Sequence, residues 1–135
     1  MTATAEGRMT KRRDSHQFSY PVAAATKIPV GVMVAITAAG VLANAAAVAA
    51  HKVVGVADAD ADNSAGIDGA IKGAVRKGAF LFFNSAAADQ ITLSSVNDSA
   101  YVVDNQTVAK TNGGNTRPVA GKIVDVDADG VWIEF

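Results

Sequence analysis

Aspartates at alternate positions are the residues of this sequence that come nearest to a recognisable chemical site. Asp58, Asp60 and Asp62 fall on positions one, three and five of an EF-hand calcium loop. The rest of the motif is missing, because position six is Asn63 rather than glycine and position twelve is Gly69 rather than a bidentate acid. Helix-forming segments do not flank the run. We therefore expect a solvated acidic loop here and not a calcium site.

Other groups that could hold a metal or a cofactor are also incomplete. The run DVDADG at 125–130 has the glycine of a calcium loop but no residue at position twelve. The two histidines, His16 and His51, lack a third ligand at a recognisable spacing. We expect no metal site and no cofactor.

Catalytic motifs are missing from the sequence as well. The serines lie in turn-forming segments without a G-x-S-x-G elbow. The glycine pair at 113–114 is not followed by the Lys-Ser/Thr of a phosphate-binding loop. We therefore expect a structural or binding protein rather than an enzyme.

Charge divides the sequence into a basic leading arm and an acidic body. Residues 1–20 carry four basic and two acidic groups, whereas residues 21–135 carry eight basic and eleven acidic groups. We expect residues 1–20 to form an extended arm and 21–135 to form one β-rich domain. The residues of the arm that could contact a negatively charged partner, or anchor the arm in its groove, are Arg8, Lys11, Arg12, Arg13, Phe18 and Tyr20. Alternatively, the basic groups are solvated and the two aromatic residues staple the arm to its own domain.

The uncharged run 28–50 is long enough to cross a membrane, but its composition argues against that. Pro29, Gly31, Gly40 and Asn44 interrupt it, and much of the remainder is alanine. Val30 to Thr37 alternates as a strand does, and 42–50 is open to a short helix, a loop or an irregular strand. We expect no membrane association.

Short alternating segments separated by turn formers dominate the rest of the chain. A strand is predicted at 52–57, and 70–83 predicts two strands or one bent strand with a bulge or corner at Gly78. A hairpin is predicted from 100–104 and 107–110 around an Asn105-Gln106 turn. The segment Phe80 to Phe83 has the highest apolar density, so part of it should lie in the core. About eight to ten short strands predict an all-β barrel or sandwich.

The segment 119–135 predicts a final hairpin whose last strand docks Phe135 into a sheet. A two-residue Asp129-Gly130 turn would oppose Asp125 to Glu134, which is unfavourable across a ladder. A three-residue loop at 128–130 removes that clash, so we favour it. Trp132 is either half-buried at a sheet edge or a contact residue for a partner.

The order of these segments resembles the small capsid decoration, or cement, proteins of tailed bacteriophages. The resemblance covers most of residues 20–135 and is carried by YPVAAATKIPVGVMVAI at 20–36, VVGVADADADNSAGIDG at 53–69, VRKGAFLFFNSA at 75–86, AYVVDNQTVAKT at 100–111 and VAGKIVDVDADGVWIEF at 119–135.

The resemblance implies a β-rich structural protein of the virion. Such a protein is made in the host cytoplasm, binds the major capsid protein on the outside of the mature head and braces the shell, often as a trimer. The six arm residues would then be capsid contacts.

Two other classes of function remain open. A small carbohydrate-binding or adhesive module could use Trp132, Tyr101 and aspartates on a shallow surface. A nucleic-acid-binding protein could use the KRR run at 11–13, although the acidic body argues against it. We expect no direct contact with nucleic acid.

Overall fold

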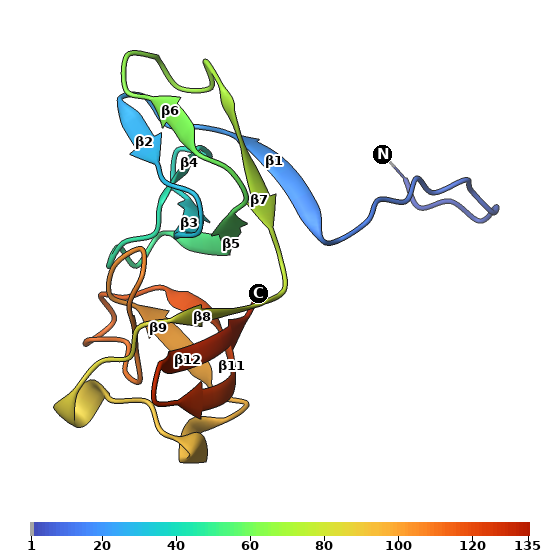
Figure 1. Cartoon of the computed structure of the whole chain (residues 1–135). Helices are drawn as coiled ribbons and strands as arrows, with labels where there is room; N and C mark the ends of the chain where they lie inside the picture. Colours follow the sequence, from blue (N-terminus) through green and yellow to red (C-terminus); the bar gives the residue numbers. More distant parts are fainter. Residues whose placement is uncertain (1) are drawn as a thin grey trace.

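The computed structural model describes residues 2–135 and is almost entirely β, as predicted. Its strands form two five-stranded antiparallel sheets and one two-stranded sheet (Figure 1). The first sheet has the order β1 (Gln17–Pro21), β7 (Lys72–Arg76), β5 (Lys52–Ala57), β3 (Met33–Ile36) and β4 (Leu42–Asn44). The second has the order β8 (Ala79–Phe82), β12 (Gly130–Glu134), β11 (Val119–Asp127), β9 (Ser99–Val102) and β10 (Val108–Ala109). The small sheet pairs β2 (Thr26–Ile28) with β6 (Ala61–Asn63), and 3-10 turns form at Ala87–Asp89 and Leu93–Ser95.

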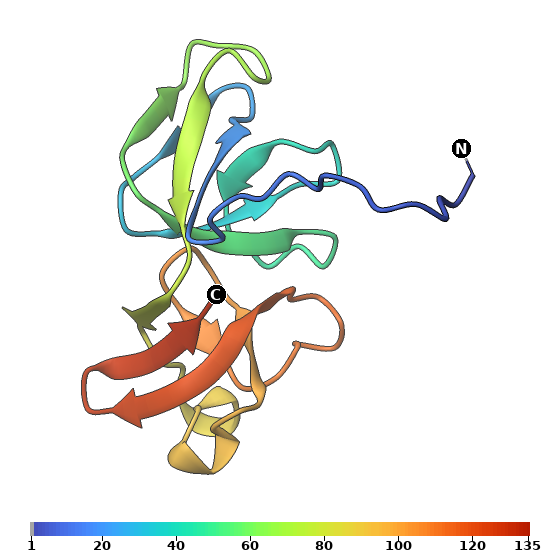
Figure 2. The same cartoon turned by 90° about the vertical axis from the view of Figure 1, so that its right-hand side faces the viewer.

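Each five-stranded sheet is closed on itself by one parallel bridge. Val22, which follows β1, bridges Leu42 of β4. Phe83, which follows β8, bridges Thr107 immediately before β10. Each bridge therefore links one edge strand of its sheet to the opposite edge strand, β1 to β4 in the first sheet and β8 to β10 in the second. The two closed sheets pack against each other in a sandwich-like body, seen as the upper and lower lobes of Figure 2.

The two sheets are copies of one topology. In chain order, the strands of the first sheet are β1, β3, β4, β5 and β7, and those of the second are β8 to β12. In both sheets these five strands take the same places, with the first at one edge, followed by the fifth, fourth, second and third. We call residues 16–77 the first repeat and residues 78–135 the second repeat.

Backbone pairing supports the duplication residue by residue. Val34 pairs with Gly55 and Ala35 with Val53, which leaves Val54 as a bulge. In the second repeat Ala100 pairs with Gly121 and Tyr101 with Val119, which leaves Ala120 as a bulge at the matching place. The ladder between the first and fifth strands also ends alike in both repeats, since Lys77 N–H donates to the carbonyl of His16 and Phe135 N–H donates to that of Gly78. The two repeats are therefore alike in their backbone geometry and not in their sequences, because few matched strand positions carry the same residue.

Matched positions also supply the cores. Alternation along each strand turns one set of apolar side chains inward, so β7 buries Gly73 and Val75 while β12 buries Val131 and Ile133. The matched core pairs are Val34 and Ala100, Ile36 and Val102, Leu42 and Val108, Ala57 and Ile123, and Val75 and Ile133.

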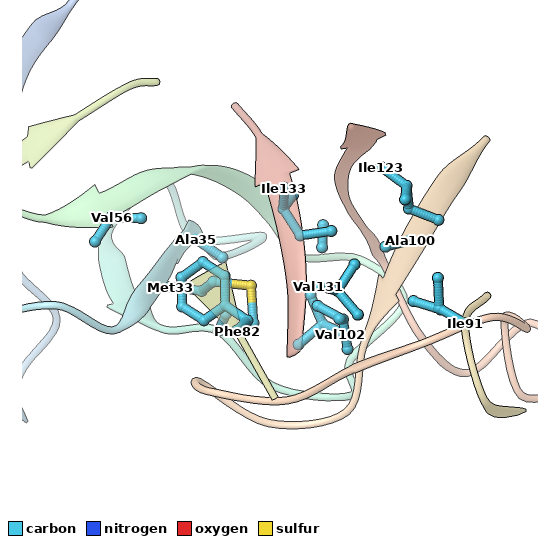
Figure 3. Close-up of a cluster of buried hydrophobic side chains, with 13 residues drawn as sticks. Met33, Ala35, Val56, Phe82, Ile91, Ala100, Val102, Ile123, Val131 and Ile133 are labelled. Carbon is cyan, nitrogen blue, oxygen red and sulfur yellow. The ribbon is translucent and has the colours of Figure 1, made fainter. Parts of the chain in front are cut away.

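A shared layer joins the two repeats. Met33, Ala35 and Val56 lie on the outer face of the first sheet, yet they are buried in the core cluster of the second repeat. Figure 3 shows Met33 and Ala35 beside Phe82. Burying a side chain of the size of Met33 or Val56 stabilises a fold by about 1.5–3 kcal/mol. The two repeats are therefore one packed body.

The predicted start of the β-rich domain needs correction. β1 pairs with β7 from Gln17 to Pro21, so the sheet begins at residue 17 and not at residue 21. Residues 2–16 form neither helix nor strand, are exposed, and run away from both lobes (Figures 1 and 2).

The final hairpin has neither of the two registers expected from the sequence. Asp127 pairs with Gly130, which leaves a two-residue Ala128-Asp129 turn. This turn places Asp125 opposite Trp132, so the clash between Asp125 and Glu134 is avoided. A bulge at Val124 then shifts the ladder by one residue and sets Lys122 opposite Glu134, so opposite charges face each other.

Phe135 docks as predicted. Its ring lies 5.8 Å from that of Phe82 in an edge-on arrangement and 6.4 Å from that of Phe80. The strand end is therefore held by aromatic contacts as well as by its backbone hydrogen bond to Gly78.

Candidate partner-binding surface

An apolar groove runs along the open edge of β8. It encloses about 350 Å³ and is lined in part by Val30, Gly31, Leu81, Phe83, Gln106 and Asp129. The exposed fractions are 58% for Phe83, 56% for Val30 and 39% for Leu81. Side chains of this size exposed together on one surface are typical of a contact site for a partner. We call this feature the β8 groove.

Alternation along β8 explains why the groove is apolar. Phe80 and Phe82 point inward, toward Phe135 and the core of the second repeat. Leu81 and Phe83 therefore point outward. A continuous apolar run cannot bury both of its faces in a sheet that is covered on one side, so part of it stays at the surface.

Backbone groups of β8 add a second feature to the groove. Phe83 N–H donates to Gln106 and Phe83 C=O accepts from Val108, on the side of the strand away from β12. Alternate residues of a strand direct their backbone groups to the same side, so Ala79 and Leu81 point theirs to this side too. The bridge closes the sheet only at Phe83, so the backbone groups of Ala79 and Leu81 on this side of the outer strand β8 can pair with an added strand.

Carboxylates border the groove. Asp129 lines it, and Asp60 accepts a hydrogen bond from Val30 N–H at 2.7 Å. Near Leu81, Trp132 lies on the outer face of β12 and donates its indole N–H to Asp127 at 3.1 Å. That bond, together with the N–H groups of Asp129 and Gly130, lowers the pKa of Asp127 below its ordinary value. This border is therefore negatively charged at neutral pH.

Basic side chains of the predicted arm lie free of the body. Arg8, Lys11, Arg12 and Arg13 are all exposed, and none forms a salt bridge within residues 2–135. Arg13 alone lies near an aromatic ring, with its guanidinium 5.6 Å from the centre of the Phe18 ring.

The two aromatic residues predicted for the arm lie in the body. Phe18 and Tyr20 are on one face of β1, with ring centres 6.2 Å apart, and both are partly buried. Tyr20 packs against the core of the first repeat. Their matched positions in the second repeat are Phe80 and Phe82. This placement favours the alternative in which they hold the chain end to its own domain.

Each aspartate of the acidic run bonds within the fold. Asp58 pairs with Arg76 at 3.3 Å, and Asp60 holds the turn at Val30. Asp62 accepts from the hydroxyl of Ser64 at 2.6 Å and from its N–H at 3.0 Å, which lowers the pKa of Asp62. Within residues 2–135, no three acidic or histidine side chains gather closely enough to hold a metal ion. His16 instead pairs with Asp14 at 2.9 Å.

The two aromatic residues considered for glycan binding, Tyr101 and Trp132, lie far apart. Tyr101 pairs with Val119 and Trp132 with Asp125, so they lie at opposite ends of β11. At about 3.3 Å per residue, their positions along β11 are roughly 20 Å apart. They do not form a common platform for one sugar ring.

The groove residues were not identified from the sequence. Val30 and Leu81 are far apart in the chain, and only the apolar run Phe80 to Phe83 hinted that one face would be exposed.

No helix in residues 2–135 is both apolar and long enough for a membrane span. Comparison with protein-family models, curated proteins and solved structures finds no match.

Proposed function

We propose that this protein is a structural protein of a phage virion, which binds the outer surface of the head and stabilises the shell. The observation that carries the proposal is the exposed basic arm, in which Arg8, Lys11, Arg12 and Arg13 stand free of the body on an extended segment. The exposed apolar side chains of the β8 groove add a gain in free energy when assembly covers them. The arrangement of sequence motifs seen in capsid decoration proteins supplies the kind of partner, the major capsid protein.

The arm supports docking on a charged shell. Four basic side chains on an exposed extended segment attract a negatively charged surface and speed association, with an effect that weakens as salt is added. An arm that becomes ordered only on binding can cover a large surface with few residues, at a cost in entropy. Arg8, Lys11, Arg12 and Arg13 are therefore the first residues to test as shell contacts. Phe18 and Tyr20 lie in β1, so they would act indirectly, by holding the strand from which the arm leaves the body.

Co-sedimentation with expanded heads of the cognate phage tests the proposal. The full chain should be compared with a chain beginning at Ser15, because a start at Pro21 would remove β1 from the first sheet. We expect the full chain to pellet with heads and to release progressively as salt rises. The shortened chain should pellet less.

The possible outcomes separate the parts of the proposal. Equal pelleting of both chains would mean that the protein binds the shell without using the arm. If neither chain pelleted at about micromolar concentration, shell binding would be rejected. Thermal unfolding of the shortened chain serves as the control for folding.

A further inference from the structure

We infer that the β8 groove of one copy binds the N-terminal arm of a second copy of this chain, as an added strand with Met9 in the groove. The inference goes beyond shell binding, because it concerns how copies of the protein hold one another. It rests on charge, on side-chain alternation along the arm, and on the open edge of β8.

The arm and the second repeat carry opposite net charges, as binding of the arm to a second copy requires. Residues 1–15 carry four basic and two acidic groups, for a net charge of +2. The second repeat, residues 78–135, carries three basic and seven acidic groups, for a net charge of −4. The arm is therefore attracted to the half of the molecule that contains β8, and carboxylates such as Asp129 line the groove itself.

Among residues 2–16, Met9 is the one large apolar side chain, and it suits the groove. Met9 is 98% exposed in the single chain. Its flexible thioether side chain adapts to irregular apolar surfaces, such as the one formed by Val30, Leu81 and Phe83. The open N–H and C=O groups of Ala79 and Leu81 would pair with the backbone of the arm.

Alternation divides the basic residues of an extended arm between two sides. With Met9 facing the groove, Lys11 and Arg13 face it too, toward its carboxylates. Arg8 and Arg12 then face away, where they remain available to the shell. The two sets carry equal charge, so they can be distinguished experimentally.

A second copy suits the groove better than the chain's own arm. The arm leaves the body at His16, whose carbonyl accepts from Lys77, and runs away from both lobes (Figures 1 and 2). Residues 2–16 could span up to about 50 Å when extended, enough to reach a neighbouring molecule.

Sedimentation equilibrium of the full chain tests the inference, with variants matched in charge. We expect the wild-type chain to exceed its monomer mass of 13.7 kDa as concentration rises to about 100 µM. Lys11→Glu and Phe83→Ser should weaken association by about tenfold or more, whereas Arg12→Glu should weaken it by less than about threefold. Phe83 is exposed, so Phe83→Ser should keep the folded circular dichroism spectrum.

Trp132 gives an independent reading, since it is the one tryptophan in the sequence and it pairs with Leu81 beside the groove. Its fluorescence should change with concentration in the wild type and in Arg12→Glu, but not in Met9→Ser. The inference would be overturned by a monomeric wild type, by equal effects of Lys11→Glu and Arg12→Glu, or by a Met9-dependent signal without a change in mass. Each result is independent of whether the protein pellets with heads.

Discussion

At the scale of single residues, Asp89 fastens the loop that follows β10. Its carboxylate accepts a hydrogen bond from the hydroxyl of Thr111 and pairs with Arg117 at 3.1 Å. The bond from Thr111 and the pairing with Arg117 lower the pKa of Asp89 below its ordinary value of 3.8. The carboxylate is therefore more acidic in the folded chain than in the unfolded chain, which links the stability of the fold to pH.

Asp89→Asn tests that link. A carboxylate with a lowered folded pKa contributes stability above the unfolded pKa, and that contribution is lost as pH falls through the lower folded value. The wild type should therefore unfold at a higher temperature than Asp89→Asn at pH 6. The difference should shrink as pH falls below 3.8. Thermal unfolding measured from pH 6 to pH 2 checks this, with Glu6→Gln in the arm as the control. A difference that does not change with pH would contradict it.

At the scale of elements, matched bulges shape both sheets. Each bulge is followed by a glycine, Gly55 in β5 and Gly121 in β11. A Cβ atom at Gly55 would lie 2.6 Å from the carbonyl oxygen of Arg76, and one at Gly121 would lie 2.5 Å from that of Glu134. Both positions bring two backbones closer than a side chain permits. Gly55 also has a φ of +147°, which other residues rarely adopt.

Gly55→Ala and Gly121→Ala should therefore both destabilise the fold by about 2 kcal/mol or more, because the backbones must move apart. Urea unfolding followed by circular dichroism measures this free energy. Gly7→Ala is the matched control, since nothing lies within 4 Å of the added methyl group in the arm. Similar stability of all three variants would show that the close approach at the bulges has no energetic weight.

At the scale of the whole molecule, the two repeats share one core layer. Met33, Ala35 and Val56 of the first repeat are buried among residues of the second. Two repeats that bury apolar surface against each other should unfold together, because opening one exposes the face of the other. The closed sheets and the shared layer therefore predict a single cooperative transition.

Val34→Ala tests this cooperativity. Val34 is fully buried inside the first repeat, and its loss should cost about 2 kcal/mol. Trp132 lies in the second repeat, yet its fluorescence transition in urea should shift together with the circular dichroism signal. Val119→Ala, at a half-exposed residue, should shift neither signal by much. A shift in circular dichroism without a shift in Trp132 fluorescence would mean that the repeats unfold separately.

Local patterns in the sequence determined the β class and several elements of this protein. The strand at 52–57 has the predicted bounds, because a valine-rich run next to an acidic turn leaves few alternatives. The corner at Gly78 and the docking of Phe135 also follow from local composition. Such features depend on neighbours in the chain, which the sequence lists directly.

Only the tertiary structure decided the register of the last hairpin, the start of the first sheet, the duplication and the β8 groove. The hairpin register depends on the Ala128-Asp129 turn and on a bulge at Val124, and the duplication consists of a strand order and pairing that different side chains can support. The groove brings Val30 to Leu81 and Phe83 across about fifty residues of chain. Contacts of that range form only when the sheets close and pack, so no local pattern could have predicted them.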